Sequence, residues 1–140
     1  MVRHAARLFV NAAALRVPVA AVVLRRGYGL GAMALTAGHF HAPVAIAAWP
    51  SAEFGAMGIE GAVRLGFRKE LDALPPEERE RRFRQRVQEA IDRGQALNMA
   101  SHLEIDDVID PAETRGWLLR VIAGASAGER PPRRPFIDAW

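Results

Sequence analysis

The glycines between Arg25 and Met33 are the residues of this sequence best suited to chemistry, because they leave backbone amides uncovered. The segment reads Arg-Arg-Gly-Tyr-Gly-Leu-Gly-Ala-Met, with glycine at positions 27, 29 and 31. Two backbone N–H groups that are free at the start of a helix can stabilise negative charge developing on an oxygen atom. A turn whose glycines only let a strand and a helix pack closely would use the same residues. The turn alone leaves both interpretations open.

The elements on either side of this turn are predicted to be a strand and a helix. Residues 17–24 form a continuous apolar run with β-branched members, which is typical of a strand buried on both faces. Residues 31–38 favour a helix, and a second apolar run at 44–49 predicts another buried strand. Helix and strand therefore alternate at the spacing of an α/β domain.

Hydrophobic spacing and capping residues predict the remaining elements. Residues 4–14 are apolar around most of a helix circumference, which predicts a buried helix. Residues 77–93 predict an amphipathic surface helix with an apolar stripe at Phe83, Val87, Ala90 and Ile91. Asp110, followed by proline and then glutamate, is typical of a capped helix start. The other expected elements are a short strand within 51–58, helices at 59–71 and 95–100, and a strand at 103–109.

Side chains offer few patterns typical of a catalytic or metal site. His39 and His41 lack a third nearby ligand, so no metal site is expected. Ser51 and Ser101 lack the Gly-x-Ser-x-Gly turn of a nucleophilic serine. A dinucleotide-binding fingerprint would need glycine where Ala34 stands. The absence of cysteine excludes thiolate nucleophiles and thiolate zinc sites, which leaves chemistry carried by backbone amides.

Length and charge limit the class of protein. The 140 residues predict one domain, at 1–124, followed by a tail at 125–140 that contains proline and arginine. Residues 1–52 carry five arginines and no acidic residue, which favours an anionic ligand. Nucleic acid is not expected, because no recognised binding motif accompanies the charge. Without an apolar span of membrane length or a signal-peptide pattern, no membrane association and a cytoplasmic location are expected.

Five ordered blocks of sequence resemble one protein family. The blocks are Val22–Ala32, Ala48–Glu53, Met57–Val63, Arg68–Leu71 and Asp106–Arg115. In these blocks the chain is similar to the carboxyltransferase (beta) subunit of biotin-dependent acyl-CoA carboxylases of the acetyl- and propionyl-CoA type, and specifically to its C-terminal half. That family has a crotonase-like fold, so the resemblance implies an α/β half-domain of spiralling ββα turns with flanking helices.

The resemblance implies transfer of a carboxyl group from N1′ of carboxybiotin to the α-carbon of an acyl-CoA. In the family, the backbone amides of a Gly-Ala pair hold the ureido oxygen of biotin, and this pair corresponds to Gly31 and Ala32. The resemblance likewise implies that the neighbouring residues of the turn contact biotin. These neighbours are Tyr28, Gly29, Leu30 and Met33, of which Met33 lies near the position that sets acyl-group selectivity.

The resemblance also implies partners. In the family, an N-terminal half supplies the acyl-CoA site, and the active site lies between subunits, so this chain is expected to be incomplete alone and to form a homo-oligomer. Biotin is expected on a separate carrier domain that a biotin carboxylase component charges, in fatty acid metabolism.

Two alternative functions stay open on the sequence. A crotonase-type hydratase or isomerase acting on acyl-CoA would need a carboxylate at the pocket, for which Glu53 and Glu60 are the candidates. A non-catalytic assembly module of a carboxylase complex would need only the helices that dock on other subunits.

Overall fold

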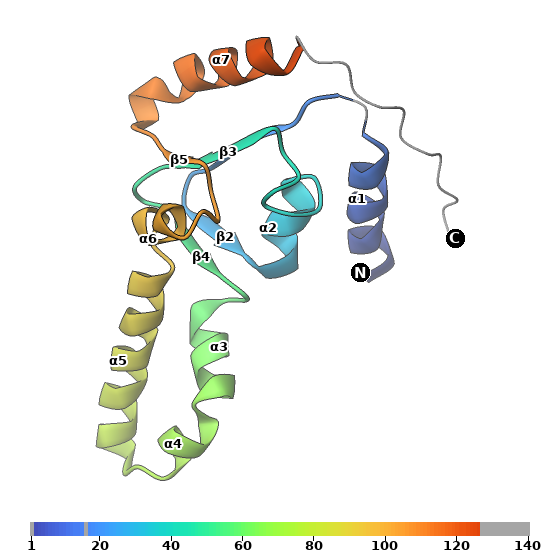
Figure 1. Cartoon of the computed structure of the whole chain (residues 1–140). Helices are drawn as coiled ribbons and strands as arrows, with labels where there is room; N and C mark the ends of the chain where they lie inside the picture. Colours follow the sequence, from blue (N-terminus) through green and yellow to red (C-terminus); the bar gives the residue numbers. More distant parts are fainter. Residues whose placement is uncertain (1, 16, 127–140) are drawn as a thin grey trace.

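Two small parallel sheets lie at the centre of the computed structural model, which describes residues 2–15 and 17–126 (Figure 1). The first sheet has the strand order β1-β3-β5, and the second pairs β2 with β4. The strands are β1 (Ala20–Val23), β2 (Arg26–Tyr28), β3 (Ala45–Ala48), β4 (Glu53–Gly55) and β5 (Asp107–Val108).

The chain alternates between the two sheets before each helical segment. It passes from β1 to β2 and into α2 (Gly29–Leu35), then from β3 to β4 and into α3 (Ile59–Gly66). The named strands pair in parallel, and each such ββα turn adds one strand to each sheet. The α/β class predicted from alternating helices and strands is therefore confirmed.

The core lies on both sides of β3. Ile46, Ala47 and Ala48 are buried, as expected for the apolar run at 44–49. On one side, Trp117 from α7 (Thr114–Ser126) packs against Ala47, and α7 lies over that face of the first sheet (Figure 1). This packing fixes the first sheet, from which the chain passes through β2 to the glycine turn.

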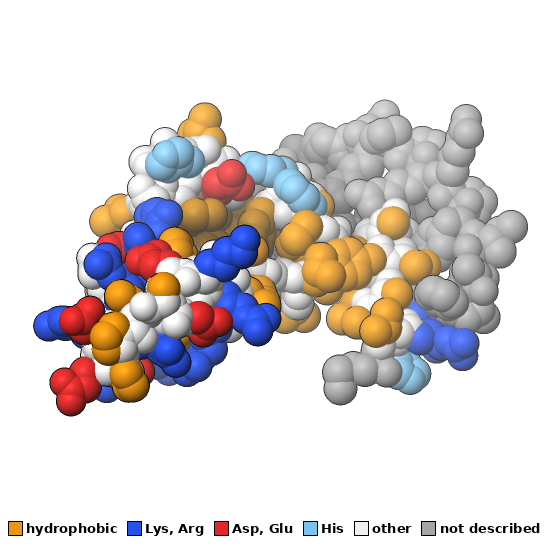
Figure 2. Space-filling view, turned by 90° about the horizontal axis from the view of Figure 1, so that it is seen from below, with side chains coloured by type: hydrophobic (Ala, Val, Ile, Leu, Met, Phe, Trp, Pro, Cys, Tyr) orange, Lys and Arg blue, Asp and Glu red, His pale blue; other side chains and the backbone are white. Residues whose placement is uncertain are grey.

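A helical arm extends away from the sheets. It consists of α3, α4 (Arg68–Asp72) and α5 (Pro76–Arg93), and α6 (Ala96–Ser101) returns the chain to the sheets (Figure 1). The stripe predicted for residues 77–93 lies in the apolar core of the arm, which confirms the amphipathic helix. Seen from below, Lys, Arg, Asp and Glu side chains are intermixed over the arm, whereas hydrophobic side chains gather towards α1 and α2 (Figure 2).

The first helix, α1 (Val2–Ala14), corrects one prediction. The helix forms, but of its described residues only Ala12 is buried, and Leu8 is 47% exposed. The helix packs chiefly on α2, at one side of the molecule (Figure 1). Among the described residues, too few side chains therefore pack against α1 to bury its apolar circumference.

Several element boundaries also differ from the predictions. The apolar run at 17–24 yields only the four residues of β1, all half-buried, because β1 is an edge strand with Val17 and Leu24 exposed beyond its ends. Strand β2 occupies residues expected to form a turn, and Phe67 divides the helix predicted at 59–71.

The C-terminal elements differ in detail. The strand predicted at 103–109 is reduced to β5, and the capped helix start at Asp110 begins as a 3-10 helix, η1 (Pro111–Glu113), before α7. Helix α7 continues through Ser126, past the predicted domain end at 124. The rest of the predicted tail lies outside the described residues. No helix in the described ranges has the length and apolar character needed to cross a bilayer.

Candidate functional site

The N-terminus of α2 presents open backbone amides. The helix begins at Gly29, with Tyr28 as its extended N-cap residue, and no side chain caps it. Residues of the first turn have no carbonyl within the helix to accept from their N–H groups, which leaves the Gly31 amide open. Ala32 is the fourth residue, the position from which a helical N–H reaches the carbonyl of the N-cap residue. That both amides serve as donors to a ligand stays a prediction.

Gly29 is the residue of this turn at which only glycine fits. Its φ of +56° lies in the left-handed region, and a Cβ atom there would stand 2.6 Å from the carbonyl oxygen of Ala56. Gly31, in contrast, has nothing within 4 Å of an added Cβ and is exposed. The close approach of Gly29 therefore fixes the start of α2 against the loop after β4, and Gly31 faces open space.

A pocket of about 690 Å³ opens beside the turn. Gly29, Leu30 and Met33 line it from α2, so three of the four predicted biotin-contacting residues reach the cavity, while Tyr28 does not. The amide pair of Gly31 and Ala32 is likewise absent from the wall. The remaining lining residues are Phe40, Phe54, Gly55, Ala56, Phe67, Ala90, Arg93, Gly94, Met99 and Glu104.

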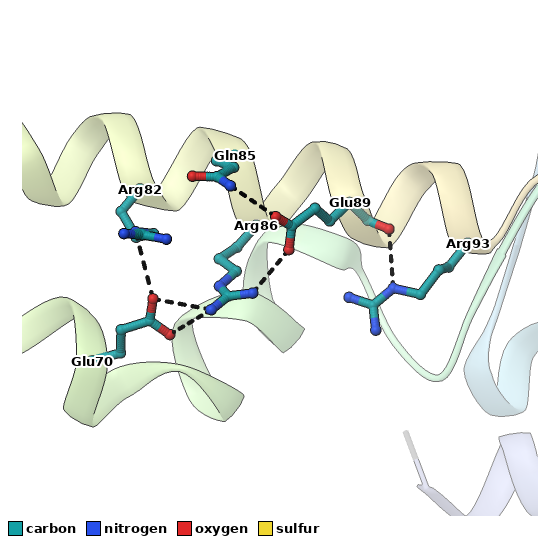
Figure 3. Close-up of polar contacts among 6 residues, drawn as sticks. All are labelled: Glu70, Arg82, Gln85, Arg86, Glu89 and Arg93. Carbon is teal, nitrogen blue, oxygen red and sulfur yellow. Dashed lines mark hydrogen bonds and ion pairs between the residues drawn. The ribbon is translucent and has the colours of Figure 1, made fainter.

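The pocket wall is mostly apolar, with two ionisable side chains. The rings of Phe40 and Phe54 meet edge-on with their centroids 5.6 Å apart. Arg93 donates from Nε to the carbonyl oxygen of Glu89 at 3.1 Å, and Figure 3 shows its terminal nitrogens turned away from Glu89. Glu104, at the wall from the segment after α6, lies 3.9 Å from Nε2 of His41. The cavity thus suits a compact ligand that is largely apolar with few polar groups.

Tyr28 turns its hydroxyl towards the neighbouring strand instead of the pocket. It donates to Oε2 of Glu53 at 2.6 Å, and Nε of Arg26 lies 3.9 Å from the same oxygen. Burial raises the pKa of the Tyr28 phenol to about 12, with further contributions from the hydrogen bond to Glu53 and from its negative charge. The phenol therefore remains a neutral donor over the physiological pH range.

The two carboxylates considered for hydratase or isomerase chemistry lie outside the pocket wall. Glu53 is engaged by Tyr28 and Arg26, and Glu60 is exposed in the first turn of α3. Neither lines the cavity. The geometry therefore does not place either residue as the acid or base that such a reaction needs.

The remaining polar candidates have local partners. Ser51 donates to the carbonyl oxygen of Leu24 at 2.8 Å, and Ser101 donates to the carbonyl oxygen of Asn98 at 2.7 Å. The rings of His39 and His41 lie 5.2 Å apart. Across residues 2–15 and 17–126, no three His, Asp or Glu side chains gather as they would around a metal ion.

Comparison with known proteins decides the family. Residues 1–134 match the family model described as the carboxyl transferase domain. The chain belongs to this family. The carboxyl transferase chain is 37% identical over 119 residues to the methylmalonyl-CoA carboxyltransferase 12S subunit of Propionibacterium freudenreichii subsp. shermanii, covering 82% of this chain and 22% of the relative. It is 32% identical over 120 residues to the propionyl-CoA carboxylase carboxyltransferase subunit of Haloferax mediterranei. This match covers 85% of this chain and 23% of the relative.

Solved structures agree with this assignment. The transcarboxylase 12S hexamer, with methylmalonyl-CoA and methylmalonic acid bound, superposes with a TM-score of 0.84 at 30% identity, over 99% of this chain and 26% of that one. A single-chain, multi-domain long-chain acyl-CoA carboxylase gives a TM-score of 0.73 at 48% identity, over 86% of this chain and 12% of that one. The crotonase-like class implied by the resemblance is confirmed. The carboxyl transferase chain spans about a quarter of the curated relatives, less than the C-terminal half that the resemblance implied.

Sequence reasoning missed the pocket wall opposite α2. Phe40, Phe67, Arg93, Met99 and Glu104 come from separate segments, and none belongs to a recognisable motif. The fold brings these segments together, with Phe67 and Arg93 on the arm and the others on the segments after α2 and around α6, so no spacing in the sequence could have identified them.

Proposed function

We propose that this chain provides the biotin side of a carboxyltransferase active site, at which a carboxyl group passes from carboxybiotin to the α-carbon of an acyl-CoA. The observation that carries the proposal is the uncapped, glycine-containing start of α2 beside an apolar pocket of about 690 Å³. Membership of the carboxyl transferase family supports it.

The amides of Gly31 and Ala32 are the proposed donors to the ureido oxygen of biotin. Negative charge develops on that oxygen as the N1′–carboxyl bond breaks. The open N–H of Gly31 would donate to it directly, and the N–H of Ala32 would share its hydrogen bond with the carbonyl of Tyr28. One such donor is worth roughly 3–4 kcal/mol in a transition state. The chain needs no side-chain base for this role.

The described residues fit a biotin ring system. Its bicycle is compact and mostly apolar, as is the pocket wall formed by Met33, Phe40 and Phe54. Gly29, Leu30 and Met33 would contact the bicycle from α2. Tyr28 does not line the pocket and would support the turn as the residue before α2. When bound, carboxybiotin supplies the carboxyl group, and this chain orients the ureido group and shields it from water.

Substrate and partners are part of the proposal. The named relatives act on methylmalonyl-CoA and propionyl-CoA, which supports an acyl-CoA of the acetyl or propionyl type. A biotin carboxyl carrier, a biotin carboxylase component and an N-terminal carboxyltransferase part would complete the reaction in the cytoplasm, in fatty acid metabolism. The hexamer of the 12S protein supports a homo-oligomer.

Two substitutions at one position test the amide donor. Gly31→Pro removes an N–H at a helix position that tolerates proline, whereas Gly31→Ala keeps the N–H and meets no neighbouring atom. In the chain combined with its N-terminal partner, we expect Gly31→Pro to abolish carboxylation with free biotin and to leave CoA binding intact. Gly31→Ala should retain activity.

Two results would contradict the proposal. Normal carboxylation by a folded Gly31→Pro variant would exclude the amide role. If the combined wild-type proteins assemble but neither bind biotin nor carboxylate acyl-CoA, the chain is an assembly module. Circular dichroism of each variant establishes that a loss of activity is not a loss of fold.

A further inference from the structure

A hydrogen bond between two adjacent strands holds Tyr28, the residue that immediately precedes α2. In the parallel register of β2 and β4, Arg26 lies opposite Glu53 and Tyr28 opposite Gly55. Side chains alternate along a strand, so Arg26 and Tyr28 project from the same face. The Glu53 carboxylate reaches diagonally along that face and accepts from the Tyr28 hydroxyl at 2.6 Å.

The start of α2 depends on this contact because the helix lacks a side-chain N-cap, which usually fixes the first turn. No side chain caps the helix, and Tyr28 itself occupies the N-cap position. The Tyr28 ring packs against the apolar cluster of the arm, which includes Ile59 and Val63, and lies beside Gly55. The ring and hydroxyl of Tyr28 therefore connect the helix start to β4 and to the arm.

We propose that Glu53 is a positioning residue for the amide donors: through Tyr28, it fixes the orientation of the first turn of α2. The carboxylate does not line the pocket. It sets the direction of the first turn of α2, which carries the proposed donor amides of Gly31 and Ala32. The inference deepens the proposed function and rests on it only for the binding measurement below.

Arg26 does not replace this contact. Its Nε lies 3.9 Å from the Glu53 carboxylate, and its side chain is 61% exposed. Exposed ion pairs at this distance contribute little, because water screens them. A short hydrogen bond to a charged acceptor is stronger and more directional. The tyrosine, which immediately precedes Gly29, is therefore the group through which Glu53 acts.

The chain offers a spectroscopic test, since Tyr28 is its one tyrosine. Phenolate absorbance in the near ultraviolet therefore reports the ionisation of Tyr28 alone. Glu53→Ala should lower the phenol pKa from about 12, because it removes both the hydrogen bond and the nearby negative charge. Glu53→Gln, which can still accept the hydrogen bond, should lie between Glu53→Ala and the wild type. Ser51→Ala, a hydroxyl deletion before β4, is the control and should titrate as wild type.

Backbone dynamics test the positioning itself. In the 15N-labelled chain, we expect order parameters at Gly29, Leu30 and Gly31 to fall from about 0.85 to below about 0.6 in Glu53→Ala. Tyr28→Phe should have the same effect, and the double variant should add nothing, because both changes remove one interaction. Glu53→Gln should restore most of the order. Unchanged order in both single variants, or fully additive effects, would overturn the proposal.

Binding of free biotin separates this inference from the proposed function. We expect Glu53→Ala to bind biotin about tenfold more weakly than wild type, and Glu53→Gln to recover most of the affinity. Equal affinity of wild type and Glu53→Ala would overturn the positioning role. If the wild type binds no biotin while the order parameters change as expected, the proposed function fails and Glu53 still positions the turn.

Discussion

The backbone N–H of Phe54 donates to the carbonyl oxygen of Gly94 at 2.7 Å, which joins the middle of β4 to the end of α5. A second hydrogen bond, from the N–H of Ala96 to the carbonyl oxygen of Ala52 at 3.1 Å, joins the start of α6 to the residue before β4. Phe54 and Gly94 both line the pocket. The arm is thus attached to the sheet at the place where it forms a pocket wall.

Gly94→Ala should destabilise the chain strongly. A Cβ at this position would overlap the carbonyl oxygen of Phe54, a backbone atom that cannot move without breaking the attachment of α5 to β4. We expect a loss of about 2–3 kcal/mol in the free energy of unfolding, measured by urea denaturation. Gly66→Ala on the same arm meets nothing within 4 Å and is the matched control. Equal stability of the two variants would show that α5 does not approach β4 this closely.

Gly29→Ala should damage both stability and the proposed biotin site. The left-handed φ of +56° costs an alanine about 1–2 kcal/mol, and the contact with the Ala56 carbonyl adds to this. We expect a lower urea midpoint and weaker binding of free biotin by titration calorimetry. Gly31→Ala, two residues along the same turn, should change neither. A Gly29→Ala variant with wild-type stability would contradict the left-handed conformation.

The elements predicted correctly from the sequence are those whose own hydrophobic side chains form the core. The buried strand at 44–49 and the amphipathic helix at 77–93 form because their own side chains supply the core on one face or both. Strand β2 was missed because its three residues carry no apolar run, and its extended state comes from pairing with β4. The prediction that α1 is buried was wrong, because composition does not determine which elements pack against a helix.

The glycine turn could be identified from the sequence, but the pocket beside it could not. Positions 29–33 combine glycines with a helix start, which is a local signal. Tyr28 turning to Glu53 depends on the register of β2 against β4, and Arg93 reaches the wall through the packing of the arm. Both arise from contacts between segments distant along the chain, which have no local sequence pattern.

Arg86→Lys should weaken the arm more than Arg84→Lys. Arg86 donates twice to Glu70 at 3.1 Å and once to Glu89 at 2.9 Å (Figure 3). Its guanidinium also covers the ring of Phe67. A lysine ammonium cannot reproduce the forked geometry or the stacking. Arg84 makes one exposed pair with Glu80, which lysine can replace.

The Arg86 comparison has a direct measurement. We expect Arg86→Lys to lower the urea midpoint and Arg84→Lys to leave it unchanged within error. The hydrogen bond from Arg86 also holds the pKa of Glu89 below its usual value, so a carboxyl titration by NMR should show this pKa rising in Arg86→Lys. Identical midpoints and an unchanged Glu89 pKa would exclude the network as a source of stability.

Asp110→Ala should remove a helix cap. The Asp110 carboxylate accepts from the N–H of Ala112 at 2.8 Å, at the start of η1 and ahead of α7. Loss of such a cap costs about 1 kcal/mol, whereas asparagine at the same position keeps most of it. We expect Asp110→Ala to lower the free energy of unfolding by this amount and Asp110→Asn to lower it by a few tenths. Asp107→Ala, an exposed carboxylate in β5, is the control. A stable Asp110→Ala variant would show that α7 does not need its cap.

Tyr28 should make the stability of the chain fall at alkaline pH. Its phenol has a pKa of about 12 in the folded chain and about 10 when unfolded, so the folded state keeps the proton more firmly. Below pH 10 both states are protonated, and the contribution of Tyr28 is complete. Between pH 10 and 12 the unfolded state loses its proton first, which favours unfolding, so stability falls as pH rises.

Tyr28→Phe isolates this effect, because phenylalanine keeps the ring and has no proton to lose. We expect the urea midpoint of the wild type to decline between pH 10 and 12 more steeply than that of Tyr28→Phe, with parallel behaviour between pH 7 and 9. Since lysine and arginine titrations occur in both proteins, the difference between the two curves belongs to the phenol. Parallel curves across the whole range would mean that neither burial nor Glu53 raises the pKa of the Tyr28 phenol in the folded chain.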